Sequence, residues 1–69
     1  MPFVNIRIVK EVISADPVGK KSAIAQKVTS AIIEETGLSE NDIWVVFEEV
    51  GARDWYVGPR SVESMRQKS

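Results

Sequence analysis

The chain opens with Met1-Pro2-Phe3-Val4-Asn5-Ile6, and the interpretation of the whole sequence starts from this stretch. A proline directly after the initiator allows Met1 to be removed, which turns the nitrogen of Pro2 into a secondary amine. A free α-amino group titrates at about 7.7–8.0, and an apolar pocket or a nearby positive charge lowers that pKa. Pro2 is therefore a candidate general base in a chain that has no histidine. The alternative is that Pro2 merely begins a strand, where its missing N–H does no harm.

The same stretch begins an alternating pattern that predicts a strand from Pro2 to Val9. One face is wholly apolar and is expected to meet the core; it consists of Val4, Ile6 and Ile8. The other face is mixed, as expected of a surface partly covered by another subunit; it consists of Phe3, Asn5, Arg7 and Val9. We expect Arg7 to form an intersubunit ion pair with Glu48 or Glu49.

A helix is predicted over residues 17–36, after a connection at residues 10–15. Asp16 is placed to accept a hydrogen bond from a free N–H of the first turn, and Pro17 suits the first helical position. Gly37 is the expected stop. An apolar stripe at helical spacing is expected to be buried; it consists of Ile24, Val28, Ala31 and Ile32, widened by Ala23 and Ala25.

A second alternating run predicts a strand from Ile43 to Val50, entered through a capped turn at residues 39–42. After a loop, the segment Trp55-Tyr56-Val57 has β character and ends at the breaker pair Gly58-Pro59. The rest, residues 60–69, is a polar tail whose last residues are expected to be mobile. Strand, helix and strand in 69 residues predict a single-domain β-α-β unit of the α/β (α+β) class, with parallel strands joined by the helix.

Composition excludes several kinds of site. Without cysteine or histidine, the chain has no thiolate, no disulfide and no cluster typical of a metal centre. Nine basic and ten acidic residues give a net charge of −1, which argues against nucleic-acid binding. No apolar run approaches the roughly 18–20 residues that span a membrane, and the start lacks a signal-peptide pattern. We therefore expect a cytoplasmic protein.

Size predicts self-association. A domain of 69 residues without disulfides has a small core, and one helix covers only one face of the predicted sheet. A second copy of the chain could cover the other face, and sheets from two chains could pair at their edges. We therefore expect an obligate homo-oligomer.

The order of these segments resembles the tautomerase superfamily, in particular the short-chain group typified by 4-oxalocrotonate tautomerase. The resemblance covers residues 2–59 and rests on the Met-Pro start, the helix, the strand ending in Phe-Glu-Glu-Val and the Trp-Tyr-Val-Gly segment. It implies a β-α-β protomer with a C-terminal hairpin, assembled as a hexamer. It also implies an enzyme whose N-terminal proline, here Pro2, catalyses keto–enol tautomerisation without a cofactor. Trp55 falls where the family has an aromatic wall of the pocket; an interface anchor is the alternative.

Two arginines that the resemblance implies are absent. The family uses one in the loop after the first strand to bind a substrate carboxylate, but residues 10–15 contain none. A second is expected to polarise the substrate carbonyl, and Trp44 stands in its place. The candidates to replace these cations, across a subunit boundary, are Lys10, Arg53 and Arg60. Phe3 is expected to wall the apolar site, and Trp44 either lines it or packs on another subunit.

Two functions are open on the sequence alone. In the first, the amine of Pro2 moves a proton between oxygen and carbon of a small enol or 2-oxo acid, with no metal or organic cofactor. In the second, the missing arginines mark a degenerate site on a non-catalytic oligomeric binding or scaffold protein. Retention of Met1 would favour the second function, because it blocks the base.

Overall fold

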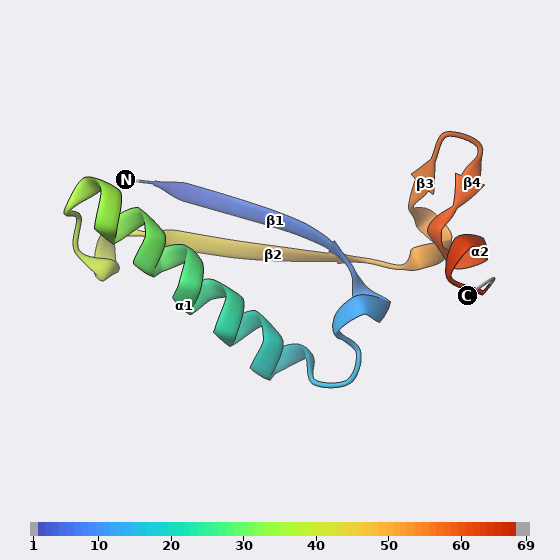
Figure 1. The fold of residues 1–69 in the computed structure, drawn as a ribbon, viewed down its shortest axis with the longest axis horizontal. Coiled ribbons are helices and arrows are strands. Elements are labelled where there is room, and N and C mark those ends of the chain that lie inside the picture. Colours follow the sequence, from blue (N-terminus) through green and yellow to red (C-terminus); the bar gives the residue numbers. More distant parts are fainter. Residues whose placement is uncertain (1, 68–69) are drawn as a thin grey trace.

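The computed structural model describes residues 2–67 of the 69-residue chain. Figure 1 shows two long strands with a helix lying along them, and a smaller unit of two short strands and a helix at one end. The elements, with η denoting a 3-10 helix, are β1 (Phe3–Val9), η1 (Lys10–Ile13), α1 (Pro17–Thr36), η2 (Glu40–Asp42), β2 (Trp44–Val50), η3 (Ala52–Asp54), β3 (Tyr56–Val57), β4 (Arg60–Ser61) and α2 (Val62–Gln67).

β1 and β2 run parallel and pair along their whole length, with Phe3 opposite Trp44 and Val9 opposite Val50. The predicted β-α-β arrangement is confirmed, and each strand begins one residue later than the sequence pattern suggests. Burial alternates as predicted. The apolar face is half-buried under α1, whereas the opposite face is exposed over most of both strands. The pleat, which turns successive side chains to opposite faces, explains this pattern.

The ends of α1 are those that the sequence predicts. Asp16 Oδ1 accepts a hydrogen bond from the N–H of Gly19 at 3.2 Å, and Pro17 begins the helix. Gly37 ends it with a φ of 75°, and its N–H donates to the carbonyl of Ile33 at 2.8 Å. A left-handed residue at this position is the usual helix stop, and glycine adopts it without a steric penalty.

The buried stripe predicted for α1 is only partly correct. Ile24, Val28 and Ile32 are half-buried against the sheet, but Ala23 and Ala31 are exposed. No residue of α1 is fully buried within the chain. A lone helix on two strands leaves its flanks in solvent, because there is no neighbouring element to cover them.

The sheet face turned away from α1 carries an ion pair. Arg7 and Glu48 lie opposite each other in the β1–β2 register, and Arg7 Nη2 lies 3.3 Å from Glu48 Oε1. The pair therefore forms within one chain, which corrects the expectation of an intersubunit pair. Glu49, on the other face, pairs with Lys21 of α1. The parallel register explains both pairings, since it fixes which carboxylate each cation meets.

The C-terminal unit packs where the two long strands end. Full burial among residues 2–67 is limited to Ile13, Ile43 and Ala52, and two of these three lie in η1 and η3, directly after the strands. β3 and β4 form a short antiparallel hairpin that turns at Gly58. This hairpin is the one that the family resemblance implies, whereas α2, which lies in the expected polar tail, was not predicted; residues 68–69 lie outside the described range. No helix within residues 2–67 has the length and apolar character that a membrane-spanning segment requires.

Candidate active site

Pro2 lies at the free end of the sheet, next to the first residue of β1. It is half-buried, and its carbonyl accepts a hydrogen bond from the N–H of Trp44 at 3.1 Å. Pro2 therefore continues the strand pairing through its carbonyl alone, and its nitrogen is not needed for the ladder.

Two aromatic side chains flank this position. Phe3 and Trp44 are opposite each other in the register, so their side chains share the exposed face of the sheet. They are 61% and 57% exposed, respectively. Three of the predicted site residues, Pro2, Phe3 and Trp44, thus lie at the same end of the sheet, with the two aromatic rings on one face and, by alternation, the Pro2 ring on the other.

The other four predicted site residues lie at the opposite end. Lys10 begins η1 directly after β1; Arg53 lies in η3, Trp55 follows it, and Arg60 lies in β4. The strands are parallel, so their carboxyl ends share one edge, and Figure 1 shows the C-terminal unit at that edge, far from the N-terminus. A seven-residue strand rising about 3.3 Å per residue separates the two ends by roughly 20 Å. No side chain bridges that distance, so one chain does not assemble all seven residues into one site.

Trp55 is the residue of the distal group whose backbone is fixed by two hydrogen bonds. It is half-buried, its N–H donates to the carbonyl of Ala52 at 3.4 Å, and its carbonyl accepts from the N–H of Val62 at 2.7 Å. The exposed cations of this group lie on the elements around it; they are Lys10, Arg53 and Arg60. This end of the chain therefore offers positive charge beside an aromatic ring, whereas the three predicted site residues at the Pro2 end carry no positive charge.

Glu11 is a residue whose role the sequence did not reveal. Its Oε1 accepts a hydrogen bond from the backbone N–H of Ala52 at 2.9 Å, which joins the loop after β1 to the segment that leads to Trp55. That N–H is the main cause of a pKa below the ordinary value of 4.5 for the Glu11 carboxyl, and Lys10 and Arg66 add attraction. No sequence signal marks this contact, because 41 positions separate the two residues.

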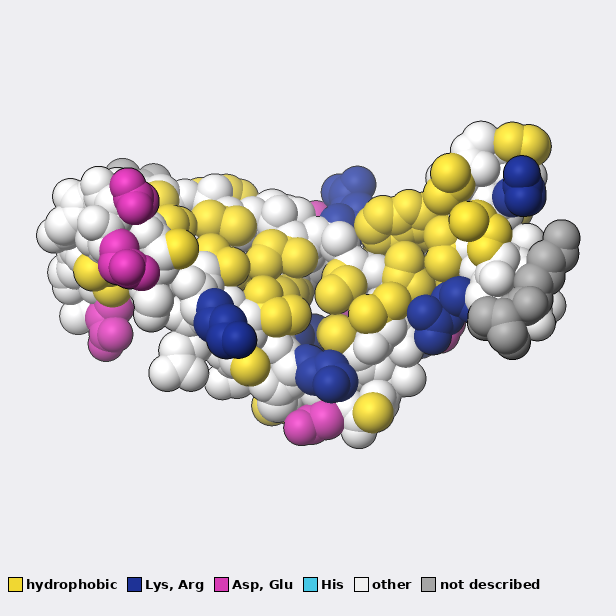
Figure 2. All heavy atoms as spheres, in the orientation of Figure 1, with side chains coloured by type: hydrophobic (Ala, Val, Ile, Leu, Met, Phe, Trp, Pro, Cys, Tyr) yellow, Lys and Arg dark blue, Asp and Glu magenta, His cyan; other side chains and the backbone are white. Residues whose placement is uncertain are grey.

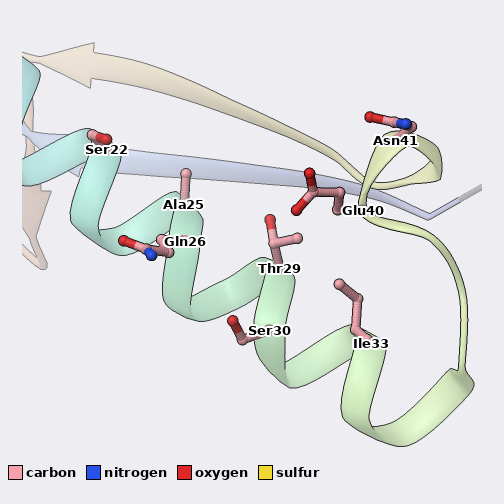
Figure 3. A pocket seen from close by; sticks show the side chains of 8 residues that line it. All are labelled: Ser22, Ala25, Gln26, Thr29, Ser30, Ile33, Glu40 and Asn41. Carbon is pink, nitrogen blue, oxygen red and sulfur yellow. The ribbon is translucent and has the colours of Figure 1, made fainter.

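A hollow lies elsewhere, between α1 and η2. It has a volume of about 500 Å³, and Figure 3 shows the side chains that line it, which are Ser22, Ala25, Gln26, Thr29, Ser30, Ile33, Glu40 and Asn41. None of the seven predicted site residues is among them. Its lining is mostly small and polar, without a paired acid and base, so it is not the site that the sequence predicts. No group of three or more carboxylates among residues 2–67 is arranged to hold a metal ion.

Comparison with known proteins identifies the family. The sequence model of the family described as "Tautomerase enzyme" matches residues 2–65. A "Probable tautomerase K2" of Dickeya dadantii is 38% identical over 69 residues, covering 100% of this chain and 98% of the relative. A "Probable tautomerase" of Bacillus cereus is 34% identical over 58 residues, covering 84% and 88% of the two chains.

Two solved structures share the fold. DmpI from Helicobacter pylori superposes with a TM-score of 0.77 at 24% identity, covering 99% of this chain and 100% of that one. YwhB, described as a homologue of 4-oxalocrotonate tautomerase, superposes with a TM-score of 0.76 at 28% identity, covering 93% and 98%. The predicted resemblance is confirmed by these matches, which extend over nearly the whole chain. The chain belongs to the tautomerase family.

Proposed function

We propose that the protein is an isomerase that uses the amine of Pro2 as general base and general acid in the keto–enol tautomerisation of small enol or 2-oxo acids. The observation that carries this proposal is the position of Pro2: it opens the strand at which the family match begins, and its nitrogen takes no part in the sheet. Family membership supports a tautomerase-type reaction on a small molecule.

The reaction needs one proton to leave oxygen and one to reach carbon. The neutral amine of Pro2 removes the proton of the enol hydroxyl, and the oxygen electron pair forms the C=O bond. The electron pair of the C=C bond then takes a proton from the pyrrolidinium, at the carbon next to the new carbonyl or at the end of a conjugated diene. The amine returns to its starting state, so the sequence is balanced without an oxidant, a reductant, a metal or a cofactor.

Phe3 and Trp44, at the same end of the sheet, are expected to contribute apolar surface near this amine. Apolar surroundings disfavour the charged pyrrolidinium and so lower the pKa of the amine toward neutrality. A base with such a pKa is present in its neutral form at pH 7 and still releases its proton readily. The two rings are exposed in the single chain, so the pocket requires a further cover.

We propose that a second copy of the chain supplies that cover and completes the site. The distal group of Trp55, Arg53, Arg60 and Lys10 lies roughly 20 Å from Pro2 along the strands, and this separation supports a site shared between subunits. A buried substrate carboxylate without a positive partner is costly, so at least one of the three distal cations is expected to contact it. Family membership supports an oligomeric assembly, and a hexamer is the assembly that we propose.

The experiment that tests this function is the ketonisation of 2-hydroxymuconate or phenylenolpyruvate, followed by ultraviolet absorbance. The protein is confirmed by intact mass to lack Met1 and is compared with Pro2→Ala and with protein that retains Met1. Positioned general bases contribute about 10²–10⁴-fold to rates, so we expect a loss of that order when Met1 is retained, because Pro2 is then an amide. Pro2→Ala keeps a primary amine and should lose less.

Pro17→Ala is the matched control, because it removes a proline that lies at the start of α1 and leaves the amine of Pro2 intact. It should keep the wild-type rate. Equal rates for protein with and without Met1 would contradict the proposed mechanism. The absence of any rate above buffer in both forms would favour a non-catalytic role for the fold.

A further inference from the structure

Glu11 connects two segments that are far apart in the sequence. It lies in η1, the turn after β1, and its carboxylate reaches the backbone N–H of Ala52 at 2.9 Å. Glu11 is half-buried and Ala52 is only 2% exposed. Ala52 is the first residue of η3, the turn that joins the long sheet to the C-terminal unit. The contact is therefore a tertiary hydrogen bond at the base of that unit.

This bond satisfies the first backbone donor of η3. Within the turn, Asp54 N–H donates to the Gly51 carbonyl at 2.9 Å and Trp55 N–H donates to the Ala52 carbonyl at 3.4 Å. The N–H of Ala52 comes first and has no partner inside the turn, as is usual for the first donors of a helix. Glu11 is the acceptor that satisfies it. Both backbone groups of Ala52 are thus paired: its N–H donates to the Glu11 carboxylate, and its carbonyl accepts from the N–H of Trp55.

The bond is assisted by charge. A carboxylate that accepts from a backbone N–H makes a stronger hydrogen bond than a neutral acceptor. Lys10 on the same turn and Arg66 on α2 attract the Glu11 carboxylate and favour its ionised form. This arrangement also matters for an anionic substrate, since donors and cations around Glu11 offset the negative charge that it would otherwise present.

We propose that Glu11 is a positioning residue, which fixes η3 so that the indole of Trp55 is held as a wall of the active site. Glu11 acts through Ala52 and Trp55 and does not touch the substrate. The inference rests on the proposed function, in which Trp55 borders the substrate of a neighbouring copy. Loss of the bond lets the backbone from Ala52 to Trp55 move, and the aromatic wall is then less well defined.

The first test measures the bond and its consequence for Trp55 without any substrate. Amide hydrogen exchange of Ala52 and the fluorine spectrum of 5-fluorotryptophan-labelled protein are compared for wild type, Glu11→Ala and Glu11→Gln. We expect at least tenfold faster exchange at Ala52 in Glu11→Ala, a smaller change in Glu11→Gln, and a shifted or broadened Trp55 signal.

The amide of Trp44, which pairs with Pro2, should be unaffected. Glu34→Ala, an exposed carboxylate on α1, is the matched control. An unchanged Ala52 amide or an unchanged Trp55 signal would overturn the proposal.

The second test is kinetic and separates positioning from simple stability. At a temperature well below unfolding, Glu11→Ala should raise KM for the enol acid about three- to tenfold and leave kcat nearly unchanged, as expected when a contact common to ground and transition state is weakened. Glu11→Asp, which keeps the charge on a shorter stem, should restore part of the loss. A purely structural residue would lower the melting temperature and leave KM unchanged, and that result would refute the positioning role. If wild type shows no Pro2-dependent turnover, the proposed function fails, and the first test still decides whether Glu11 holds Trp55.

Discussion

Glu11 and Glu48 show how single contacts set the ionisation of a side chain in this protein. The pKa of the Glu48 carboxyl lies below the ordinary value of 4.5, first because of hydrogen bonding from Asn5 and then because of Arg7 across the strands. The pKa of the Glu11 carboxyl is lowered first by the N–H of Ala52. Both carboxylates are therefore ionised at neutral pH and accept from groups that are fixed by the fold.

The lowered pKa of Glu11 predicts a pH-dependent contribution to stability. A group whose pKa is lower in the folded state stabilises the fold above its unfolded pKa, and this contribution is lost as the pH falls through the folded pKa. Glu11→Gln should therefore be less stable than wild type at pH 7, and the difference should shrink as the pH falls below the unfolded pKa and through the lower folded pKa, until both states are protonated in strong acid. Urea unfolding at pH 7 and in acid, with equal protein concentrations, measures this difference.

Glu34→Gln serves as the control for this measurement, because Glu34 is an exposed residue of α1 on the same chain. Its stability difference from wild type should be small and should not change between the two pH values. A difference for Glu11→Gln that stays constant from pH 7 to acid would mean that the charge of Glu11 contributes nothing.

The limits of sequence reasoning are clearest for these residues. Pro2 could be proposed from its place after Met1, and the Phe3–Trp44 pair could be placed on one face by alternation. The contact of Glu11 with Ala52 could not be predicted, because it depends on how η1 and η3 pack after two parallel strands. For Arg7 the sequence left Glu48 and Glu49 open as partners and suggested a pair between subunits, since the register of β1 on β2, which places Glu48 opposite Arg7 in the same chain, was not known.

At the scale of elements, the sequence was sufficient to predict a helix or strand wherever capping residues or a clear alternation define its ends. The start and stop of α1 follow from Asp16, Pro17 and Gly37, and both long strands follow from alternation. The hairpin of β3 and β4 was implied only by the family resemblance, and α2 was not predicted, because two and six residues carry too little periodicity to be recognised. The burial of the apolar stripe of α1 was overestimated. Periodicity shows which face of a helix turns inward, but it does not show how much of that face other elements cover.

The start of α1 gives a prediction for this element. A Cβ added at Gly19 would lie 2.8 Å from Asp16 Cγ, so the side chain that caps the helix would have to turn away. Alanine favours a helix over glycine by up to about 1 kcal/mol, and loss of an Asp cap costs about 1 kcal/mol. Gly19→Ala should therefore leave stability nearly unchanged in the wild-type chain.

The same substitution should behave differently when the cap is already absent. Asp16→Ala should destabilise the fold by about 1 kcal/mol, and Gly19→Ala added to it should recover most of that loss, because no side chain then opposes the new Cβ. Urea unfolding of the four proteins gives this double-mutant cycle. An equal gain from Gly19→Ala in both backgrounds would show that the cap and the glycine are independent.

At the scale of the whole molecule, the single chain is more extended than a compact domain of the same length. Its longest dimension is 44 Å and its radius of gyration is 14.9 Å, whereas a compact chain of this length would have a radius near 11 Å. Figure 2 shows hydrophobic side chains in a band that runs from the long strands to the C-terminal unit. The outer sheet face adds Phe3, Trp44 and Val46, all exposed. The sequence could predict that a second copy is needed, but not that the site residues would divide between opposite ends of the chain.

Because the predicted site residues lie at opposite ends of the chain, a substitution that prevents assembly is expected to abolish activity as well. Val46 is 39% exposed on the outer sheet face and is not a proposed site residue, so Val46→Glu should fold as a single chain without difficulty. If a second copy covers that face, the new carboxylate is buried without a partner, which costs several kcal/mol. Light scattering should then show wild type as an oligomer, about 46 kDa for six chains of 7.7 kDa, and Val46→Glu as smaller species. The ketonisation activity of Val46→Glu should be low.

Val18→Glu is the matched control, because Val18 is 80% exposed on α1. This variant should retain both assembly and activity. A monomeric wild type that is fully active at micromolar concentration would exclude the shared site, since Pro2 and Trp55 of one chain lie too far apart to act on the same substrate.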